Sequence, residues 1–207
     1  MRMQHDSDLT LRRKAMLKIY KLGEEVLRQN CEEVKPEEIN DELRTLIKEM
    51  FLTMDEANGV GLAAPQVGIA KRFFVAMADD DVERVFINPV ITKTSSELSE
   101  YEEGCLSIPG VYETIVRPKA VTISALDMNG KPFTIDAEGL LARIVQHESD
   151  HLDGVLYIDR GDEEFKNKTI ETFKKRQANA AAKAAKKAAK KAKLEAKLNA
   201  KKTNGAN

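Results

Sequence analysis

Residues 137–152 constrain the fold most, because they predict an amphipathic helix that carries reactive side chains on its apolar stripe. Its apolar residues recur at helical spacing: Leu140, Leu141, Ile144, Val145 and Leu152. His147 and His151 continue this stripe, with Glu148 between them, and Gly154 follows as a stop signal. Two imidazoles at i and i+4 lie about 6 Å apart on one face. They can bind one metal ion, and Glu148 can then reach the metal's water without being a ligand.

Two histidines need at least one more protein ligand. Cys105, in the sequence EGCLS, is one candidate, and a carboxylate such as Glu163 or Glu171 is another, as in zinc proteases. His5 lies in a polar leader and Cys31 in a charged run, so neither is expected to take part.

The remaining pattern mixes strands with a second main helix and shows no βαβ alternation, which favours an α+β fold. The expected elements are a short strand or turn in LKIYKLG from Met16 on, a helix over 36–58, strands over 73–77, 85–91, 121–127 and 132–136, and a weaker helix over 163–176. Asn129-Gly130 predicts a hairpin with a type I′ turn, since that turn needs positive φ at both central residues.

Between positions 59 and 68 lies a glycine-rich loop, GVGLAAPQVG. It contains GxG but neither GxGxxG nor the Walker lysine, so phosphate binding is not expected and a tight packing turn is the plain alternative. Gln66 is the one polar side chain in this loop, and it needs a partner if it is buried.

Length and composition limit the class of protein. The chain has 207 residues, of which 42% are hydrophobic and 32% charged, so it suits one domain with tails and is too apolar to be wholly disordered. No apolar run is long enough to cross a bilayer, and the first fifteen residues lack the apolar core of a secretory signal. Two cysteines exclude a disulfide scaffold and indicate a reducing, cytoplasmic compartment.

The net charge of −1 hides a strong asymmetry. Residues 174–207 hold twelve Lys or Arg and one acid, which leaves 21 basic and 33 acidic residues in 1–173. We therefore expect an N-terminal extension over 1–15, an acidic folded domain over 16–173 and a basic tail over 174–207. Such a tail suggests a polyanionic partner rather than a membrane, because its large apolar residues are only Leu194 and Leu198.

On a helix, the lysines of this tail fall within about half of the circumference. They are Lys183, Lys186, Lys187, Lys190, Lys191, Lys193, Lys197, Lys201 and Lys202. Alanine favours helix and like charges at i,i+4 oppose it, so a frayed helix is expected until a polyanion neutralises the lysines.

Taken together, three segments resemble the peptide deformylases: GVGLAAPQVG, EGCLS and QHESDHLDG, in the order of that family. The resemblance covers about residues 16–160, and it implies that the domain over 16–173 is the catalytic domain. It implies a compact α+β domain, with antiparallel β-sheets packed around a central metal-binding HExxH helix, to which this chain adds its basic C-terminal tail. It also implies removal of the formyl group from the N-terminal methionine of new polypeptides.

By position, the resemblance assigns the metal ligands, the acid/base and the oxyanion donors. The ligands are Cys105, His147 and His151, and water or hydroxide held by the metal attacks the formyl carbon. Glu148 is the general base and acid, and Gln66 with the backbone N–H of Leu106 supplies the oxyanion donors.

The resemblance also implies a peptide-binding edge formed by Val60, Gly61 and Gly104. An apolar pocket for the methionine side chain is expected, and Leu140 and Ile144, together with Val60, are candidate walls.

The family's metal is Fe²⁺, with Zn²⁺, Ni²⁺ or Co²⁺ as substitutes, and its substrates are N-formylmethionyl nascent peptides. A basic C-terminal helix suggests contact with ribosomal RNA through residues 174–207, and a charge run that only aids solubility is the alternative for this tail. Two alternatives stay open: an HExxH zinc endopeptidase with a carboxylate as third ligand, and a polyanion-binding protein with an inactive deformylase-like body.

Overall fold

The structure, a computed structural model, describes the backbone of residues 16–204 and the side chains of residues 16–191. Its helices are α2 (Asp41–Glu56), α3 (Gly139–Leu152) and α4 (Glu163–Asn204), with short 3₁₀ turns η1 (Glu25–Arg28), η2 (Pro36–Glu38), η3 (Ala64–Val67) and η4 (Tyr157–Asp159). Its strands are β1 (Gly61–Ala63), β2 (Phe73–Met77), β3 (Glu83–Thr94), β4 (Leu98–Cys105), β5 (Ile108–Pro118), β6 (Ala120–Leu126) and β7 (Pro132–Glu138). The chain forms two compact units, which divide between Lys166 and Asn167 inside α4.

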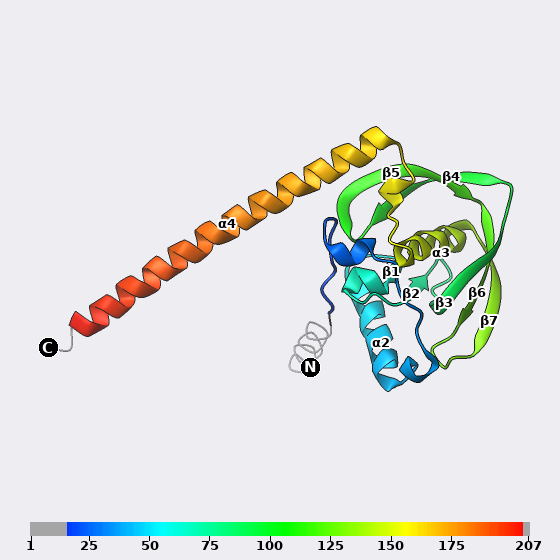
Figure 1. Cartoon of the computed structure of the whole chain (residues 1–207), viewed down its shortest axis with the longest axis horizontal. Coiled ribbons are helices and arrows are strands. Elements are labelled where there is room, and N and C mark those ends of the chain that lie inside the picture. Colours follow the sequence, from blue (N-terminus) through cyan, green and yellow to red (C-terminus); the bar gives the residue numbers. More distant parts are fainter. Residues whose placement is uncertain (1–15, 205–207) are drawn as a thin grey trace, which may run out of the picture. The chain divides into compact units, whose positions relative to one another are not determined.

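An antiparallel sheet of order β1-β2-β3-β6-β7 separates the helices α2 and α3 (Figure 1). Successive strand residues point to opposite faces. Phe73 and Val75 of β2 accordingly pack in the core that includes α2, and Phe74 and Ala76 pack in the core that includes α3. Because both faces of this sheet are covered, α3 is held in the interior. The predicted α+β class is therefore confirmed.

The β4–β5 hairpin forms a second, two-stranded sheet, which the sequence patterns do not predict. Its strands pair antiparallel, and Cys105 ends β4 opposite Ile108. Glu103 of β4 and Arg117 of β5 are buried, although both are charged. The strands therefore lack the apolar alternation by which a strand is recognised.

Helix α3 begins two residues later than position 137, where the sequence predicts it. Ala137 and Glu138 still pair with β6, and the chain turns from strand to helix at Gly139, whose φ is 57°. At the other end, the expected stop at Gly154 is present with a φ of 69°. A Cβ there would come within 2.7 Å of the carbonyl oxygen of Arg28, so only glycine fits.

The first predicted helix is split in two. Pro36 begins the short turn η2, and α2 begins only after Asn40, whose side chain accepts hydrogen bonds from the backbone N–H groups of Glu42 and Leu43. This N-cap fixes the start of α2 five residues after Pro36. In the preceding segment, LKIYKLG forms a turn at Leu22 and Gly23 and no strand.

The hairpin between β6 and β7 is confirmed, but its predicted turn type is wrong. Gly130 alone of the Asn129-Gly130 pair has a positive φ, at 77°. The N–H of Gly130 donates to the carbonyl of Asp127 at 2.9 Å, and the Asp127 carboxylate accepts from the N–H groups of Asn129 and Lys131. This side-chain capping favours a type I turn followed by glycine over the type I′ turn.

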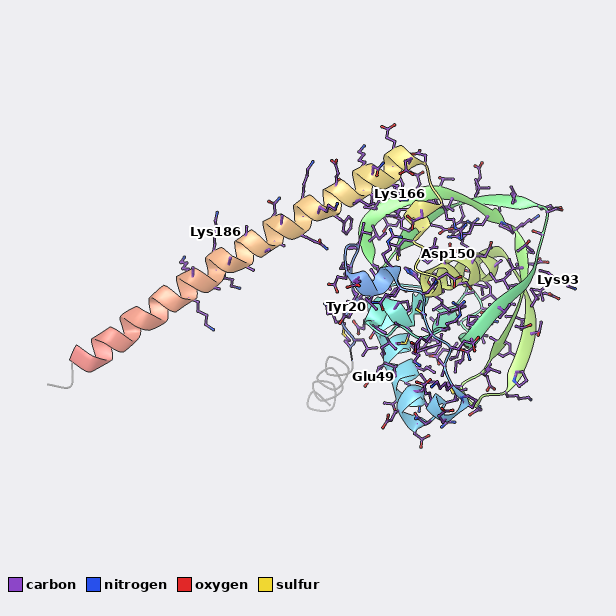
Figure 2. All side chains as sticks on the ribbon, viewed as in Figure 1. Tyr20, Glu49, Lys93, Asp150, Lys166 and Lys186 are labelled. Atoms are coloured by element: carbon purple, nitrogen blue, oxygen red, sulfur yellow. The ribbon has the colours of Figure 1, made fainter. Side chains whose placement is uncertain are left out.

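Helix α4 is continuous through the expected boundary between residues 173 and 174. The lysines of the basic stripe whose side chains are described are exposed: Lys183, Lys186, Lys187, Lys190 and Lys191. Figure 2 marks Lys186 on this helix. The side chains of Lys193, Lys197, Lys201 and Lys202 lie outside the described residues, as do the N-terminal extension over 1–15 and its His5.

Within the described part of the chain, no helix has both the length and the apolar character of a membrane span.

Candidate active site

The β4–β5 hairpin and α3 bring together three side chains that can bind one metal ion. Cys105, His147 and His151 each offer a ligand atom, and these atoms lie within 4.8 Å of one another. Sγ of Cys105 is 3.3 Å from Nε2 of His151. Within residues 16–191 this is the one such cluster found, and neither Glu163 nor Glu171 belongs to it. A thiolate and two imidazoles suit a divalent transition metal with an open fourth position.

A buried carboxylate orients one of the imidazoles. Oε2 of Glu103 lies 2.9 Å from Nδ1 of His147, so the Nδ1–H group of a neutral ring donates to Glu103 and Nε2 keeps its lone pair for a metal. The His147 ring also stacks on Tyr157, with ring centroids 5.9 Å apart. For His151, burial lowers the pKa, which favours the neutral form that binds metals.

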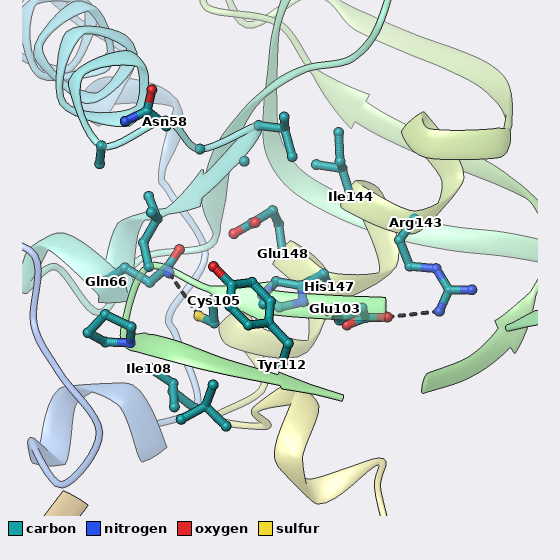
Figure 3. Close-up of a pocket in the computed structure, with 18 of the residues that line it drawn as sticks. Asn58, Gln66, Glu103, Cys105, Ile108, Tyr112, Arg143, Ile144, His147 and Glu148 are labelled. Carbon is teal, nitrogen blue, oxygen red and sulfur yellow. Dashed lines mark hydrogen bonds and ion pairs between the residues drawn. The ribbon is translucent and has the colours of Figure 1, made fainter. Parts of the chain in front are cut away.

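Glu103 belongs to a buried network of charges that joins the hairpin to α3. Its carboxylate accepts a hydrogen bond from Arg117 of β5 at 2.7 Å. It also accepts one from Arg143 of α3 at 2.8 Å, which Figure 3 marks. Arg117 also donates to Asp150 of α3 at 2.7 Å. Burial opposes ionisation of Glu103, but His147 and Arg117 hold the pKa of its carboxyl well below the usual range. The network thus fixes the strand of Cys105 against the helix of both histidines.

Glu148 lies beside these ligands, at the wall that β1 and α3 share. It is buried, and its Oε2 atom has no hydrogen-bond partner among the described residues. A Cβ on Gly61 would stand 2.4 Å from Oε1 of Glu148, so glycine at this position makes room for the carboxylate. Burial raises the pKa of Glu148 to about 7. A carboxyl group with such a pKa can both accept and donate a proton near neutral pH.

Gln66 is buried and its amide is held in one orientation. Oε1 accepts from the N–H of Ala63 at 2.7 Å. This bond directs Nε2 toward Ser107 Oγ at 3.3 Å and toward Cys105 Sγ at 3.4 Å, the contact that Figure 3 marks. The partner that the sequence requires for this polar side chain is therefore present.

A pocket of about 710 Å³ opens over these groups. Ten of the residues that the sequence analysis names line it: Val60, Gly61, Gln66, Gly104, Cys105, Leu106, Leu140, Ile144, His147 and Glu148. His151, whose Nε2 atom lies 3.3 Å from Sγ of Cys105, does not itself line the pocket. A Cβ on Gly104 would come within 2.6 Å of the Tyr112 ring, so a side chain there would displace this ring from its present position.

Four charged residues that support the metal-binding candidates were not predicted from the sequence: Glu103, Arg117, Arg143 and Asp150. Two of these residues could have been identified from the sequence. Arg143 lies four residues before His147 and Asp150 lies three residues after it, so all three share one face of the helix. Charged residues beside a metal ligand on a buried helix face indicate a supporting network.

Comparison with known proteins gives the class to which this site belongs. The sequence model of the family described as Polypeptide deformylase matches residues 16–167. The peptide deformylase of Treponema pallidum strain Nichols is 50% identical over 152 residues, which cover 73% of this chain and 92% of that protein. The Fusobacterium nucleatum enzyme is 50% identical over 143 residues, or 69% and 82%.

Solved structures of peptide deformylases are also similar to this chain. A peptide deformylase from Synechococcus elongatus, in complex with actinonin, is 46% identical with a TM-score of 0.70, and covers 75% of this chain and 86% of that one. A peptide deformylase from Legionella pneumophila is 43% identical with a TM-score of 0.71, over 79% and 98%.

The chain therefore belongs to the polypeptide deformylase family of metal-dependent hydrolases. It removes the N-formyl group from the N-terminal methionine of newly synthesised polypeptides and releases formate. This family membership rules out the alternative of an HExxH endopeptidase. In agreement, the group of possible metal ligands found among the described residues contains no carboxylate.

Proposed function

We propose that Cys105, His147 and His151 hold one divalent metal ion and that the surrounding side chains divide the steps of deformylation among them. The observation that carries this assignment is the approach of the three ligand atoms within 4.8 Å, beside the buried carboxylate of Glu148. When bound, such an ion lowers the pKa of a water molecule and polarises a carbonyl group. The protein's own groups transfer the proton, bind the formyl oxygen and bind the peptide.

Glu148 moves the proton. Its carboxylate takes a proton from the attacking water and returns it to the amine that leaves. The raised pKa supports both directions of transfer, because a group that titrates near pH 7 has accessible charged and neutral forms.

Gln66 and Leu106 bind the formyl oxygen as negative charge develops on it. The amide of Gln66 is already directed at the Cys105 sulfur by its bond from Ala63, so it needs little reorientation to donate to an oxygen held near the same ligand. The backbone N–H of Leu106 belongs to the next residue after Cys105 and completes the pair.

The pocket selects the substrate. Val60, Gly61 and Gly104 form the edge along which the peptide lies, and Leu140, Ile144 and Val60 form apolar walls for the methionine side chain. Val60 is 45% exposed and lines the pocket, so a ligand in the pocket can contact its side chain.

We further propose Fe²⁺ as the working metal, with Zn²⁺, Ni²⁺ and Co²⁺ as substitutes, and the cytoplasm as the compartment. The basic stripe of α4 and the charge of residues 174–207 support contact with ribosomal RNA, where formylated chains emerge.

Anaerobic purification, elemental analysis and a formate-release assay on formyl-Met-Ala-Ser together test this assignment. We expect one metal ion per chain, predominantly iron, and formate release that stops when a chelator removes the metal and returns when Fe²⁺ is added. A metal-free preparation with full activity would refute the proposal. Cleavage of a casein-type substrate would favour an endopeptidase instead.

A further inference from the structure

The segment Tyr20–Leu22 ties together the two loops that carry Gln66 and Cys105. The backbone N–H of Tyr20 donates to the carbonyl of Gln66 at 2.8 Å, and that of Leu22 donates to the carbonyl of Ser107 at 2.9 Å. Figure 2 marks Tyr20 on this segment. The residue between these two anchors is Lys21, and the expected site does not include it.

Lys21 places a positive charge on the loop of Cys105. Its Nζ atom donates to the carbonyl oxygen of Leu106 at 2.7 Å, and the side chain lines the pocket. Burial lowers the pKa of Lys21, and the nearby Cys105 opposes that shift. A charge-assisted hydrogen bond of this length is among the stronger kinds in proteins.

The peptide group that Lys21 contacts also reaches the sulfur of Cys105. The carbonyl of Leu106 and the N–H of Ser107 belong to one peptide unit, and that N–H donates to Cys105 Sγ at 3.4 Å. A cation on the carbonyl end polarises the unit and makes its N–H a stronger donor, because hydrogen bonds in a chain reinforce one another. The positive charge of Lys21 is thus relayed to the thiolate through the Leu106–Ser107 peptide.

We propose that Lys21 is a positioning residue that tunes the Cys105 thiolate through this peptide. It strengthens the hydrogen bond to sulfur and lowers the electron density that the thiolate gives to a metal. It also holds Leu106, whose N–H is a proposed oxyanion donor. The inference rests on the proposed role of Cys105 as a metal ligand.

Cobalt-substituted protein tests this relay by the energy of the thiolate-to-cobalt charge-transfer band. We expect Lys21→Met and Lys21→Gln to move the band to longer wavelength, because a sulfur with a weaker hydrogen bond gives up an electron more easily. Lys21→Arg keeps the charge and should keep the wild-type band. In the same Lys21→Met and Lys21→Gln proteins, loaded with metal, kcat for formyl-Met-Ala-Ser should fall by about 10–100-fold with little change in KM.

Lys18→Met is the matched control. It removes one lysine three residues away whose side chain is 65% exposed and pairs with Glu24, and it should leave both band and kcat unchanged. An unshifted band in folded Lys21→Met and Lys21→Gln would overturn the proposal. A raised KM with an unshifted band would also overturn it and make Lys21 a substrate contact. Absence of the band from the wild-type protein would instead refute Cys105 as a ligand.

Discussion

Oε2 of Glu103 lies 2.9 Å from Nδ1 of His147, and both side chains are buried. Glu103 stands two residues before Cys105, so the strand that supplies the proposed sulfur ligand also supplies the group that orients a proposed imidazole ligand. The two halves of the proposed metal site, from β4 and from α3, are therefore coupled directly and not only through the core.

The first prediction concerns this contact. Glu103→Gln removes the charge that holds His147 and should weaken metal binding by about 10–100-fold, as the loss of such a partner typically does. Titration of the metal-free protein with Zn²⁺ against a competing chelator measures the effect. Glu100→Gln, an exposed change on the same strand, is the control. Equal affinities of the two variants would contradict the role of Glu103.

The second prediction concerns Arg117, which joins Glu103 to Asp150. Arg117→Met leaves both carboxylates with fewer partners in the interior and should lower the free energy of unfolding by about 3–5 kcal/mol. Urea denaturation measures this loss. Lys119→Met breaks an exposed pair with Glu97 and should cost no more than about 1 kcal/mol. Similar losses in the two variants would mean that the buried network does not stabilise the fold.

The third prediction concerns the sulfur ligand. The cobalt-substituted wild-type protein should show a thiolate-to-metal charge-transfer band, and this band should be absent from Cys105→Ser, because a hydroxyl is a poor substitute for a thiolate. Metal retention should also fall. A spectrum that the substitution leaves unchanged would move the third ligand elsewhere.

The fourth prediction concerns the basic stripe on α4. The full chain should co-sediment with ribosomes at low salt and dissociate at high salt, because phosphate contacts weaken steeply with ionic strength. A chain that ends at Arg176 should not co-sediment, and it should keep formate release from a free formyl-peptide, since every proposed catalytic residue precedes it.

A full-length variant separates charge from length in this experiment. It replaces the exposed lysines 183, 186, 187, 190 and 191 by glutamine. Loss of binding in this variant indicates that charge is responsible. Binding that survives both truncation and high salt would rule out docking through the tail.

The helix that carries His147 and His151 was predictable because its apolar residues repeat with a clear helical period and a glycine ends it. Strands β2 and β6 were predictable from their runs of β-formers. The site residues came together as expected because three separate motifs pointed to one family, and not because any one pattern located them in space.

The β4–β5 hairpin and its charges were not predictable in the same way. Its inner face carries Glu103 and Arg117, which pair with α3 and with each other, so the strand has no apolar alternation to reveal it. Lys21 was missed for a related reason, because its role depends on a contact with Leu106, 85 residues away, which no local pattern encodes.

The most direct test of the proposed mechanism is to measure formate release by Glu148→Gln and the metal content of the same sample. Glu148 faces the site without being a ligand, so the variant should bind as much metal as the wild-type protein. Its rate should fall by about 10²–10⁴-fold, the usual cost of removing a positioned acid/base. A metal-replete Glu148→Gln protein that releases formate at the wild-type rate would contradict the proposed mechanism.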